Sequence, residues 1–279
     1  MRMPGEHEIM HIIDAALRED IGDGDLTSEA IFSGGGLSTA RVVAKEDGVF
    51  CGGEVVRMVY RRLNPEVRVV ARKSDGEAIA SGETALMLSG PTEALLTGER
   101  TALNFAQRMS GIATATRSAV ALLAGTQIRI LDTRKTAPGL RLLDKYSVAA
   151  GGGTNHRMGL FDMAMIKDNH IRAAGGITEA VRRVRAMHGT RFEVEVEVTN
   201  AAGAREAAEA GADIIMLDNM DRDRMSEAIE IVAGRAKIEA SGNMDEMRIK
   251  GITDLAIDFI SIGALTHSVR AFDLSMRFE

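Results

Sequence analysis

The sequence predicts an α/β protein of two domains, a small mixed domain followed by a parallel α/β barrel that is either closed or incomplete. Length is the first observation, because 279 residues correspond to about two domains. The second is a change of pattern: alternating segments predict antiparallel strands before residue 91, whereas short apolar runs alternate with helical segments from residue 128 onward. The hydrophobic fraction of 45% and the charged fraction of 27% are ordinary for a globular chain.

The first 90 residues predict helices and strands in mixed order. Helices are expected from Glu8 to Arg18 and over 54–63, with a polar turn around 21–28 between the first helix and the strands. Residues 37–50 and 67–90 alternate as strands do, and their Asp-Gly pairs predict hairpin turns. We expect this domain to cover 1–111, with the C-terminal residues 266–279 packing back on it.

A long helical stretch follows these strands. Pro91 is suited to its start, and Gly98 and Gly111 are expected to mark either breaks in the helix or places of close packing. The domain boundary is expected in this stretch.

Six apolar runs predict the parallel strands of the second domain, over 112–265. Their last four ends recur every 22 residues or so, roughly the length of one strand, loop and helix in a parallel barrel. Asn200 or Thr199, and Asp221, are suitable helix caps after two of the runs. An open doubly wound sheet is the rival architecture, but polar residues end strand after strand around one ring, which favours a barrel. The runs are residues 128–135, 163–170, 192–200, 212–219, 237–243 and 258–264.

Charge and composition exclude several classes of protein. A net charge of −6, the absence of Trp and the presence of only two Tyr argue against nucleic-acid binding. No apolar stretch approaches the roughly 20 residues of a membrane span. The lone Cys51 excludes an internal disulfide and a zinc site and fits a reducing compartment. The N-terminal residues lack the pattern of a secretory signal, so a cytoplasmic location is expected. The 16 methionines are interpreted as packing residues, Met163, Met165 and Met216 among them.

One segment reverses the overall acidic balance. Between Arg129 and Arg172, eight Lys and Arg residues face only four Asp residues. A basic segment in an acidic protein suggests a pocket for a small anionic ligand.

The residues that end the predicted strands are the candidates for the active site, because parallel barrels place their active sites at the carboxyl ends of the strands. Guanidinium groups bind planar carboxylates in bidentate fashion, and lysines act as compact charges on phosphate. Carboxylates at neighbouring strand ends suit sugar hydroxyls or Mg²⁺. Backbone N–H groups near glycines after the last two strands form a recurrent phosphate site. The ends supply cations first (Arg134, Lys135, Arg157, Lys167), then carboxylates (Glu197, Asp218), then small residues (Ser241, Gly242, Asn243, Gly263, Ala264).

Several of these features have a simpler structural interpretation. Glu193, Glu195 and Glu197 share one strand face, which either lines the barrel or is exposed. The glycines 151–153 match no nucleotide-binding pattern and are interpreted as structural. His7 and His11 lack a third ligand and are expected on the surface; Asp213 and Asp258 are expected in turns; His170 and His267 are left undecided.

A long ordered series of motifs resembles the quinolinate phosphoribosyltransferases, the carboxylating nicotinate-nucleotide pyrophosphorylases. The series comprises TRKTAPGLRLLDKYSVAAGGGTNHRMGLFDMAMIKDNHI, EVEVEV, ADIIMLDNM, IEASGN and DFISIGALTHS, with DIGDGDLTS, GVFCGGEV and GERTALNFAQRMSGIATATR before them. It covers nearly the whole chain. The resemblance implies an N-terminal α/β sandwich domain followed by an incomplete TIM-like α/β barrel.

The resemblance also implies an activity, a cofactor and an assembly. The family transfers ribose 5-phosphate from phosphoribosyl pyrophosphate to quinolinate with loss of CO₂, giving nicotinate mononucleotide for de novo NAD synthesis. It implies Mg²⁺, held by Glu197 and Asp218 directly or through water. It implies a homodimer or higher homo-oligomer, in which Arg100 reaches the neighbouring subunit's site.

Roles follow position by position from the resemblance. Arg134, His156 and Arg157 would bind the quinolinate carboxylates, and Lys135 and Lys167 would lie between the two substrates. The catalytic set would be Lys135, Lys167, Glu197 and Asp218. The substrate-binding set would be Arg100, Thr133, Arg134, Lys135, His156, Arg157, Lys167, Glu197, Asp218, Ser241, Gly242, Asn243, Ile262, Gly263 and Ala264.

Three other functions are weighed against this one. Pyrophosphorylase-like proteins associated with molybdate transport tend to lose the lysine strand end, which is present here in IKDNH. Nicotinate phosphoribosyltransferase uses a monocarboxylate, and the motif series argues against it. A non-catalytic anion-binding barrel would not need the complete set of Lys135, Lys167, Glu197 and Asp218.

Overall fold

The computed structural model describes residues 2–32 and 35–279 and divides the chain into two compact units. The first contains residues up to 117, 136–152 and 264–279, and the second contains 118–135 and 153–263. No helix among the described residues is long and apolar enough to cross a bilayer.

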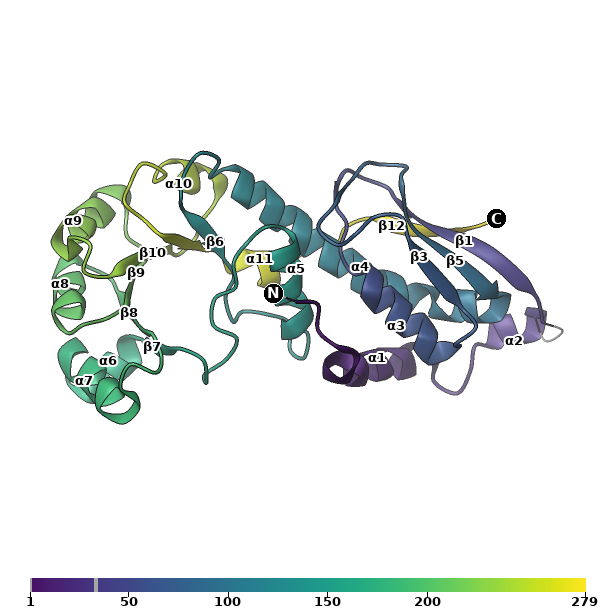
Figure 1. Ribbon diagram of the computed structural model, residues 1–279, viewed down its shortest axis with the longest axis horizontal. Helices are drawn as coiled ribbons and strands as arrows, with labels where there is room; N and C mark the ends of the chain where they lie inside the picture. Colours follow the sequence, from purple (N-terminus) through teal and green to yellow (C-terminus); the bar gives the residue numbers. More distant parts are fainter. Residues whose placement is uncertain (1, 33–34) are drawn as a thin grey trace. The chain divides into compact units, whose positions relative to one another are not determined.

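A four-stranded antiparallel sheet forms the centre of the first unit, with strand order β12-β1-β5-β3 (Figure 1). Side chains from α1, α3 and α4 share one core with β1 and β5, for example Ile13, Val59, Ala106 and Leu86. The elements are α1 (Glu6–Ile21), α2 (Leu26–Phe32), β1 (Leu37–Ala44), β2 (Gly48–Val49), α3 (Gly53–Leu63), β3 (Arg68–Ala71), β4 (Ala78–Ile79), β5 (Thr84–Pro91), α4 (Thr92–Ala121), α5 (Arg141–Ala150), α11 (Ala264–His267) and β12 (Leu274–Phe278).

The predicted Asp-Gly hairpins are wrong, although the predicted strands exist. β2 pairs with β4, and β3 pairs with β5, so the partners are not consecutive in sequence. At the second Asp-Gly pair, Asp75 Oδ1 accepts hydrogen bonds from Gly52 N at 2.9 Å and Gly53 N at 3.0 Å. Asp75 therefore caps the start of α3 rather than closing a two-residue hairpin.

The helix α4 continues through both glycines that were expected to mark breaks or close packing. A Cβ on Gly98 would lie 2.6 Å from Tyr60 Cε1, and one on Gly111 would lie 2.1 Å from Arg270 O. Both positions therefore serve close packing.

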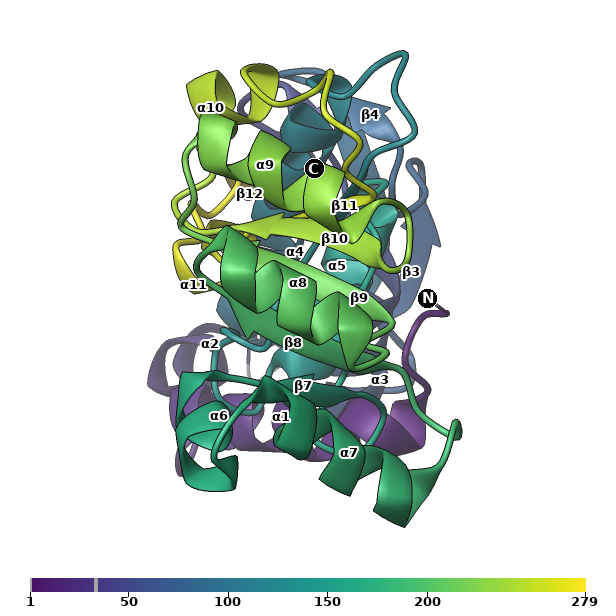
Figure 2. The same cartoon turned by 90° about the vertical axis from the view of Figure 1, so that its left-hand side faces the viewer.

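Six parallel strands form the second unit, with strand order β6-β11-β10-β9-β8-β7. Figure 2 shows α7, α8 and α9 together on one face of this sheet. Successive strands from β7 to β11 are neighbours, and β6 then pairs with β11. The elements are β6 (Arg129–Leu131), β7 (Ala164–Ile166), α6 (Asp168–Ala174), α7 (Ile177–His188), β8 (Val194–Val198), α8 (Ala201–Glu209), β9 (Ile214–Asp218), α9 (Arg222–Val232), β10 (Lys237–Ser241), α10 (Glu246–Lys250) and β11 (Phe259–Ser261).

The strand order decides between the two predicted architectures. It runs in one direction without the reversal that a doubly wound sheet has, and β6 and β7 are both edge strands. The second unit is therefore an incomplete α/β barrel, open between β6 and β7, which confirms the predicted fold class.

Short polar contacts fix the ends of the barrel elements. Asn200 caps α8 by accepting from Gly203 N, and Asp221 caps α9 by accepting from Arg224 N. At the opposite end of the strands, Asp213 accepts from Val194 N, and Asp258 accepts from Ile238 N. These aspartates tie neighbouring strand starts together, so they are structural rather than catalytic.

Candidate active site

A cavity of about 360 Å³ lies at the carboxyl ends of the barrel strands. Its wall mixes cations, carboxylates, hydroxyls and two thioethers. The lining residues are Thr133, Arg134, Lys135, His156, Arg157, Met165, Lys167, Glu197, Met216, Asp218, Asn219, Glu239, Ser241 and Ser261.

The cations of this cavity come from the two strands at the opening of the barrel. Arg134 and Lys135 follow β6, and Lys167 follows β7. Burial, and then the positive charge of Arg134, lower the pKa of the Arg157 guanidinium. Two guanidinium groups that repel each other in one cavity form a site suited to an anionic ligand.

The carboxylates come from β8 and β9, in the middle of the sheet. Glu197 Oε2 lies 2.5 Å from Lys167 Nζ, and Asp218 Oδ2 accepts a hydrogen bond from Asn219 Nδ2 at 2.9 Å. Each carboxylate therefore has one oxygen held by a neighbouring side chain.

A buried cluster of one histidine and two glutamates lies at the same cavity. His156 Nε2 lies 3.0 Å from Glu195 Oε2 and 3.4 Å from Glu239 Oε2, and both glutamate side chains are fully buried. Burial opposes a charge on the ring, but the contacts with Glu195 and Glu239 outweigh it and raise the pKa of His156. Burial also raises the pKa of Glu195, to about 7, against the contact with His156. His156 Nδ1 accepts from Arg157 N at 2.7 Å, so both ring nitrogens face protein groups.

Small residues and hydroxyls end the last two strands. Ser261 Oγ donates to Ser241 Oγ at 3.1 Å. After β10 the backbone turns through two residues with positive φ, Gly242 at 96° and Asn243 at 46°. Turns with such backbone conformations occur at many anion sites in proteins.

The cavity brings together most, but not all, of the residues that the sequence identifies. The lining includes Thr133, Arg134, Lys135, His156, Arg157, Lys167, Glu197, Asp218 and Ser241. Gly242, Asn243, Ile262, Gly263 and Ala264 do not line it, although each follows β10 or β11. Arg100 lies on α4 in the first unit with an exposed side chain.

Five lining residues were not assigned to the site from the sequence: Met165, Met216, Asn219, Glu239 and Ser261. Met165, Met216 and Glu239 each lie on a strand, two positions before an identified residue at or just after the end of that strand, so strand alternation gives a signal for them. The earlier interpretation of Met165 and Met216 as packing residues is incomplete, because both also line the cavity.

The structural interpretations of the glutamates around β8, the glycines 151–153 and the two N-terminal histidines have different outcomes. Glu193 pairs with Lys237 at 3.1 Å near the strand starts, whereas Glu195 is buried and Glu197 lines the cavity. A Cβ on Gly151 would lie 2.5 Å from Ala113 O, which fits the structural interpretation of glycines 151–153. His7 and His11 are exposed on α1.

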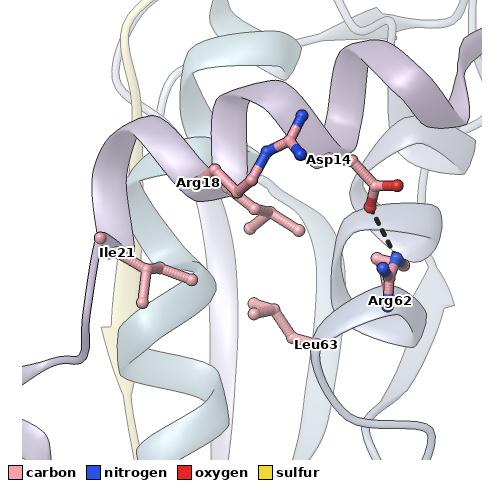
Figure 3. Close-up of a pocket in the computed structure, with 7 residues that line it drawn as sticks. Asp14, Arg18, Ile21, Arg62 and Leu63 are labelled. Carbon is pink, nitrogen blue, oxygen red and sulfur yellow. Dashed lines mark hydrogen bonds and ion pairs between the residues drawn. The ribbon is translucent and has the colours of Figure 1, made fainter.

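A second cavity, of about 270 Å³, lies in the first unit between α1 and α3. Figure 3 shows its lining residues Arg18, Ile21 and Leu63, with Asp14 paired to Arg62 across 2.6 Å. Arg62 is exposed to solvent and Asp14 is partly exposed. The converging charges and buried acids of the barrel cavity have no counterpart here, so the barrel cavity is the candidate site.

Comparisons with known proteins agree with this assignment. Family models for the N-terminal and C-terminal domains of quinolinate phosphoribosyl transferase match residues 25–110 and 112–277. The probable nicotinate-nucleotide pyrophosphorylase [carboxylating] of Bacillus subtilis is 45% identical over 96% of this chain and 93% of its own length. NadC from Streptococcus pyogenes superposes with a TM-score of 0.95 at 44% identity, over 99% of this chain and 98% of that one. The nicotinate-nucleotide pyrophosphorylase from Francisella tularensis does so with a TM-score of 0.95 at 38% identity, over 99% and 98%. The chain belongs to the quinolinate phosphoribosyl transferase family.

Proposed function

We propose that this chain transfers the ribose 5-phosphate unit of phosphoribosyl pyrophosphate to the ring nitrogen of quinolinate. The 2-carboxylate leaves as CO₂, and nicotinate mononucleotide and pyrophosphate are the other products, a step of de novo NAD synthesis. The observation that carries this proposal is one cavity lined by cations from β6 and β7 and by carboxylates from β8 and β9. Such a cavity suits two anionic substrates, of which one also carries hydroxyl groups.

The quinolinate subsite in this proposal lies at the cationic side of the cavity. Arg134 and Arg157 offer planar donor pairs that match carboxylates. His156 belongs to the same subsite, where its Nδ1 accepts from the Arg157 backbone and so holds that residue beside the substrate. Thr133 and Lys135 border it, and Thr133 Oγ1 accepts from Lys135 N at 3.0 Å.

The donor subsite lies at the carboxylate side. Glu197 and Asp218 each accept one hydrogen bond from a protein side chain, and the second oxygen of each, Oε1 and Oδ1, is assigned to ribose hydroxyls. Ser241, Gly242 and Asn243 are assigned to the 5-phosphate, and residues 262–264 are assigned to the same phosphate.

Magnesium is proposed as the cofactor, and the donor set fits it. Two carboxylates at one cavity, each with an oxygen that makes no hydrogen bond within the described residues, offer the hard oxygen ligands that Mg²⁺ prefers. Glu197 and Asp218 would hold the ion directly or through water. When bound, it would neutralise charge on the pyrophosphate as that group leaves.

The chemistry requires the chain to bring a ring nitrogen and a sugar carbon together. The nitrogen lone pair forms a bond to ribose C1 while the C1–O bond to pyrophosphate breaks and its electron pair leaves with pyrophosphate. Lys135 and Lys167 stabilise the negative charge between the substrates. Glycosylation makes the ring nitrogen cationic, and this charge stabilises the electron pair left on C2 when CO₂ departs. C2 then takes a proton from water.

A homodimeric assembly and a cytoplasmic location are proposed together with this function. Arg100 is exposed on the first unit, and Leu160 and Phe161, close to Arg157 in sequence, are 75% and 73% exposed in the single chain. These exposed groups support an active form that is at least a homodimer, in which Arg100 completes the partner's site. The buried free thiol of Cys51 supports a reducing, cytoplasmic location.

A substrate assay tests the proposed function. Purified protein is mixed with quinolinate, phosphoribosyl pyrophosphate and Mg²⁺, and quinolinate consumption and CO₂ release are followed, with nicotinic acid as the control substrate. Equal amounts of quinolinate consumed and CO₂ released are expected. Preference for nicotinic acid, or the absence of turnover, would contradict the proposal.

A further inference from the structure

Asn219 follows Asp218 at the end of β9 and lines the cavity, but the reaction described above gives it no role. Its backbone has a φ of 53°, in the left-handed region. Among residues with a side chain, asparagine is one of those that adopt this region most readily. Its N–H donates to Ser241 O at 3.0 Å, which extends the pairing of β9 with β10.

The side chain of Asn219 reaches two parts of the proposed donor subsite. Its Nδ2 donates to Asp218 Oδ2 at 2.9 Å. Its Oδ1 faces Gly242, because a Cβ on Gly242 would lie 2.2 Å from that oxygen. The opposite orientation of the amide would place its oxygen against an ionised carboxylate, so Asp218 determines which way the amide lies.

Gly242 is adapted to this side chain in two ways. Its φ of 96° disfavours any residue with a Cβ, and that Cβ would also lie 2.5 Å from Asn219 Cγ and 3.0 Å from Asn219 N. The amide of Asn219 therefore occupies the space that a side chain at position 242 would fill. The carboxylate at the end of β9 and the turn after β10 are joined through Asn219.

We propose that Asn219 is a positioning residue for the phosphoribosyl donor. It holds one oxygen of Asp218 so that the other points to the ribose hydroxyls, and it fixes the turn at Gly242 that receives the 5-phosphate. This inference rests on the proposed function, and it concerns the donor and not quinolinate.

Asn219→Gly is the main test variant, because glycine keeps the left-handed backbone and removes only the amide. Loss of a hydrogen bond to a charged group corresponds to a decrease in affinity on the order of tenfold. We expect the dissociation constant of phosphoribosyl pyrophosphate, measured by calorimetry with Mg²⁺ and without it, to rise by about that factor, and KM for the donor to rise with it. The affinity for quinolinate measured alone is expected to stay unchanged.

Asn200→Gly is the matched control. Asn200 also follows a barrel strand, but it does not line the cavity. Its side chain caps α8 by accepting a hydrogen bond from Gly203 N. Glycine is an acceptable cap, so folding and donor affinity are both expected to remain close to those of the unmodified protein. Gly242→Ala, checked for folding by circular dichroism, is expected to weaken donor binding as Asn219→Gly does.

The outcomes separate this inference from the proposed function. Weaker donor binding in Asn219→Gly, with quinolinate binding and Asn200→Gly unaffected, supports it. Donor affinity equal to that of the unmodified protein overturns it, and so does an equal loss of affinity for both substrates, because that indicates a general disturbance of the cavity. If the unmodified protein binds the donor but does not consume quinolinate, the proposed function fails while the comparison of donor affinities still tests Asn219.

Discussion

Lys167 Nζ lies 2.5 Å from Glu197 Oε2, so the cation that follows β7 is paired with the carboxylate near the end of β8. The pair stands between the cationic and the carboxylate sides of the cavity. Glu197 thus has two functions in the proposed mechanism, because it balances Lys167 with one oxygen and offers the other to the donor.

This pairing leads to a prediction about Glu197 and Asp218. Glu197→Ala and Asp218→Ala are expected to weaken binding of phosphoribosyl pyrophosphate by a factor on the order of ten or more, because each removes an acceptor for hydroxyls and Mg²⁺. Quinolinate affinity, measured without the donor, should change little. Calorimetry with each substrate alone provides both values. If quinolinate binding were lost while donor binding survived, the two subsites would have to be exchanged.

Arg134 tests the geometry of the quinolinate subsite. Arg134→Lys keeps the charge and loses the planar pair of donors, so quinolinate turnover should fall by a factor on the order of ten or more. Steady-state kinetics with quinolinate and nicotinic acid measure the effect. A variant with unchanged kcat/KM would show that Arg134 makes no bidentate contact in the transition state.

Variants at Arg100 test whether this residue completes the active site of the partner subunit. Arg100→Ala and Lys135→Ala chains are each expected to be inactive. After random exchange between equal amounts of the two chains, about half of the symmetric dimers are hybrids with one intact site each, so about a quarter of all sites should be active. The assay is turnover of quinolinate before and after mixing. Subunit exchange without any recovered activity would contradict the assignment of Arg100 to the partner's site.

The buried cluster predicts a stability effect that depends on pH. His156→Ala leaves Glu195 and Glu239 facing each other without the ring N–H between them, which should lower the free energy of unfolding by about 1–3 kcal/mol near pH 8. Burial already raises the pKa of Glu195 to about 7, above the roughly 4.3 of an unfolded glutamate. The folded variant therefore binds more protons than the unfolded chain, and its stability falls as pH rises across that interval.

Urea unfolding of His156→Ala at pH 5 and at pH 8 measures this dependence. His267→Ala removes an exposed histidine and serves as the control, for which little change is expected at either pH. A His156→Ala variant that was equally destabilised at both pH values would show that the glutamates are not held as a buried pair.

Two ion pairs of the first unit differ in burial and predict different stability effects. Arg108 donates to both oxygens of Asp144, at 2.8 Å each, and the Asp144 side chain is fully buried. Arg108→Ala should cost about 3–5 kcal/mol, because it leaves a buried carboxylate without its cation. The pair of Arg62 with Asp14 is exposed, so Arg62→Ala should cost about 1 kcal/mol or less. Urea unfolding compares the two variants, and equal losses would contradict this argument.

The sequence predicted the barrel strands because each strand is a short apolar run that ends in polar residues. It did not predict the strand partners of the first unit, because pairing there joins segments that are not consecutive, such as β2 with β4. Local Asp-Gly signals carry no information about such pairing.

The site was predictable where a functional side chain ends a strand, as at Lys167 or Asp218. The contact between Glu239 and His156 was not predictable, because His156 lies on an irregular connection whose path no periodic pattern describes. The role of Asn219 also depends on a backbone conformation and on its approach to Gly242, which become visible only in three dimensions.

The pairing of β12 with β1 has a consequence for biosynthesis. β1 ends at Ala44 and β12 begins at Leu274, so the ribosome makes one partner near the start of the chain and the other at its end. Because translation adds about 5–20 residues per second, one edge of β1 remains unpaired for roughly ten seconds to a minute. An unpaired edge can join a strand of another nascent chain. A chain that ends before Leu274 therefore exposes β1 instead of β12 as the edge of this sheet, and the unpaired backbone groups of β1 remain open to a strand of another chain.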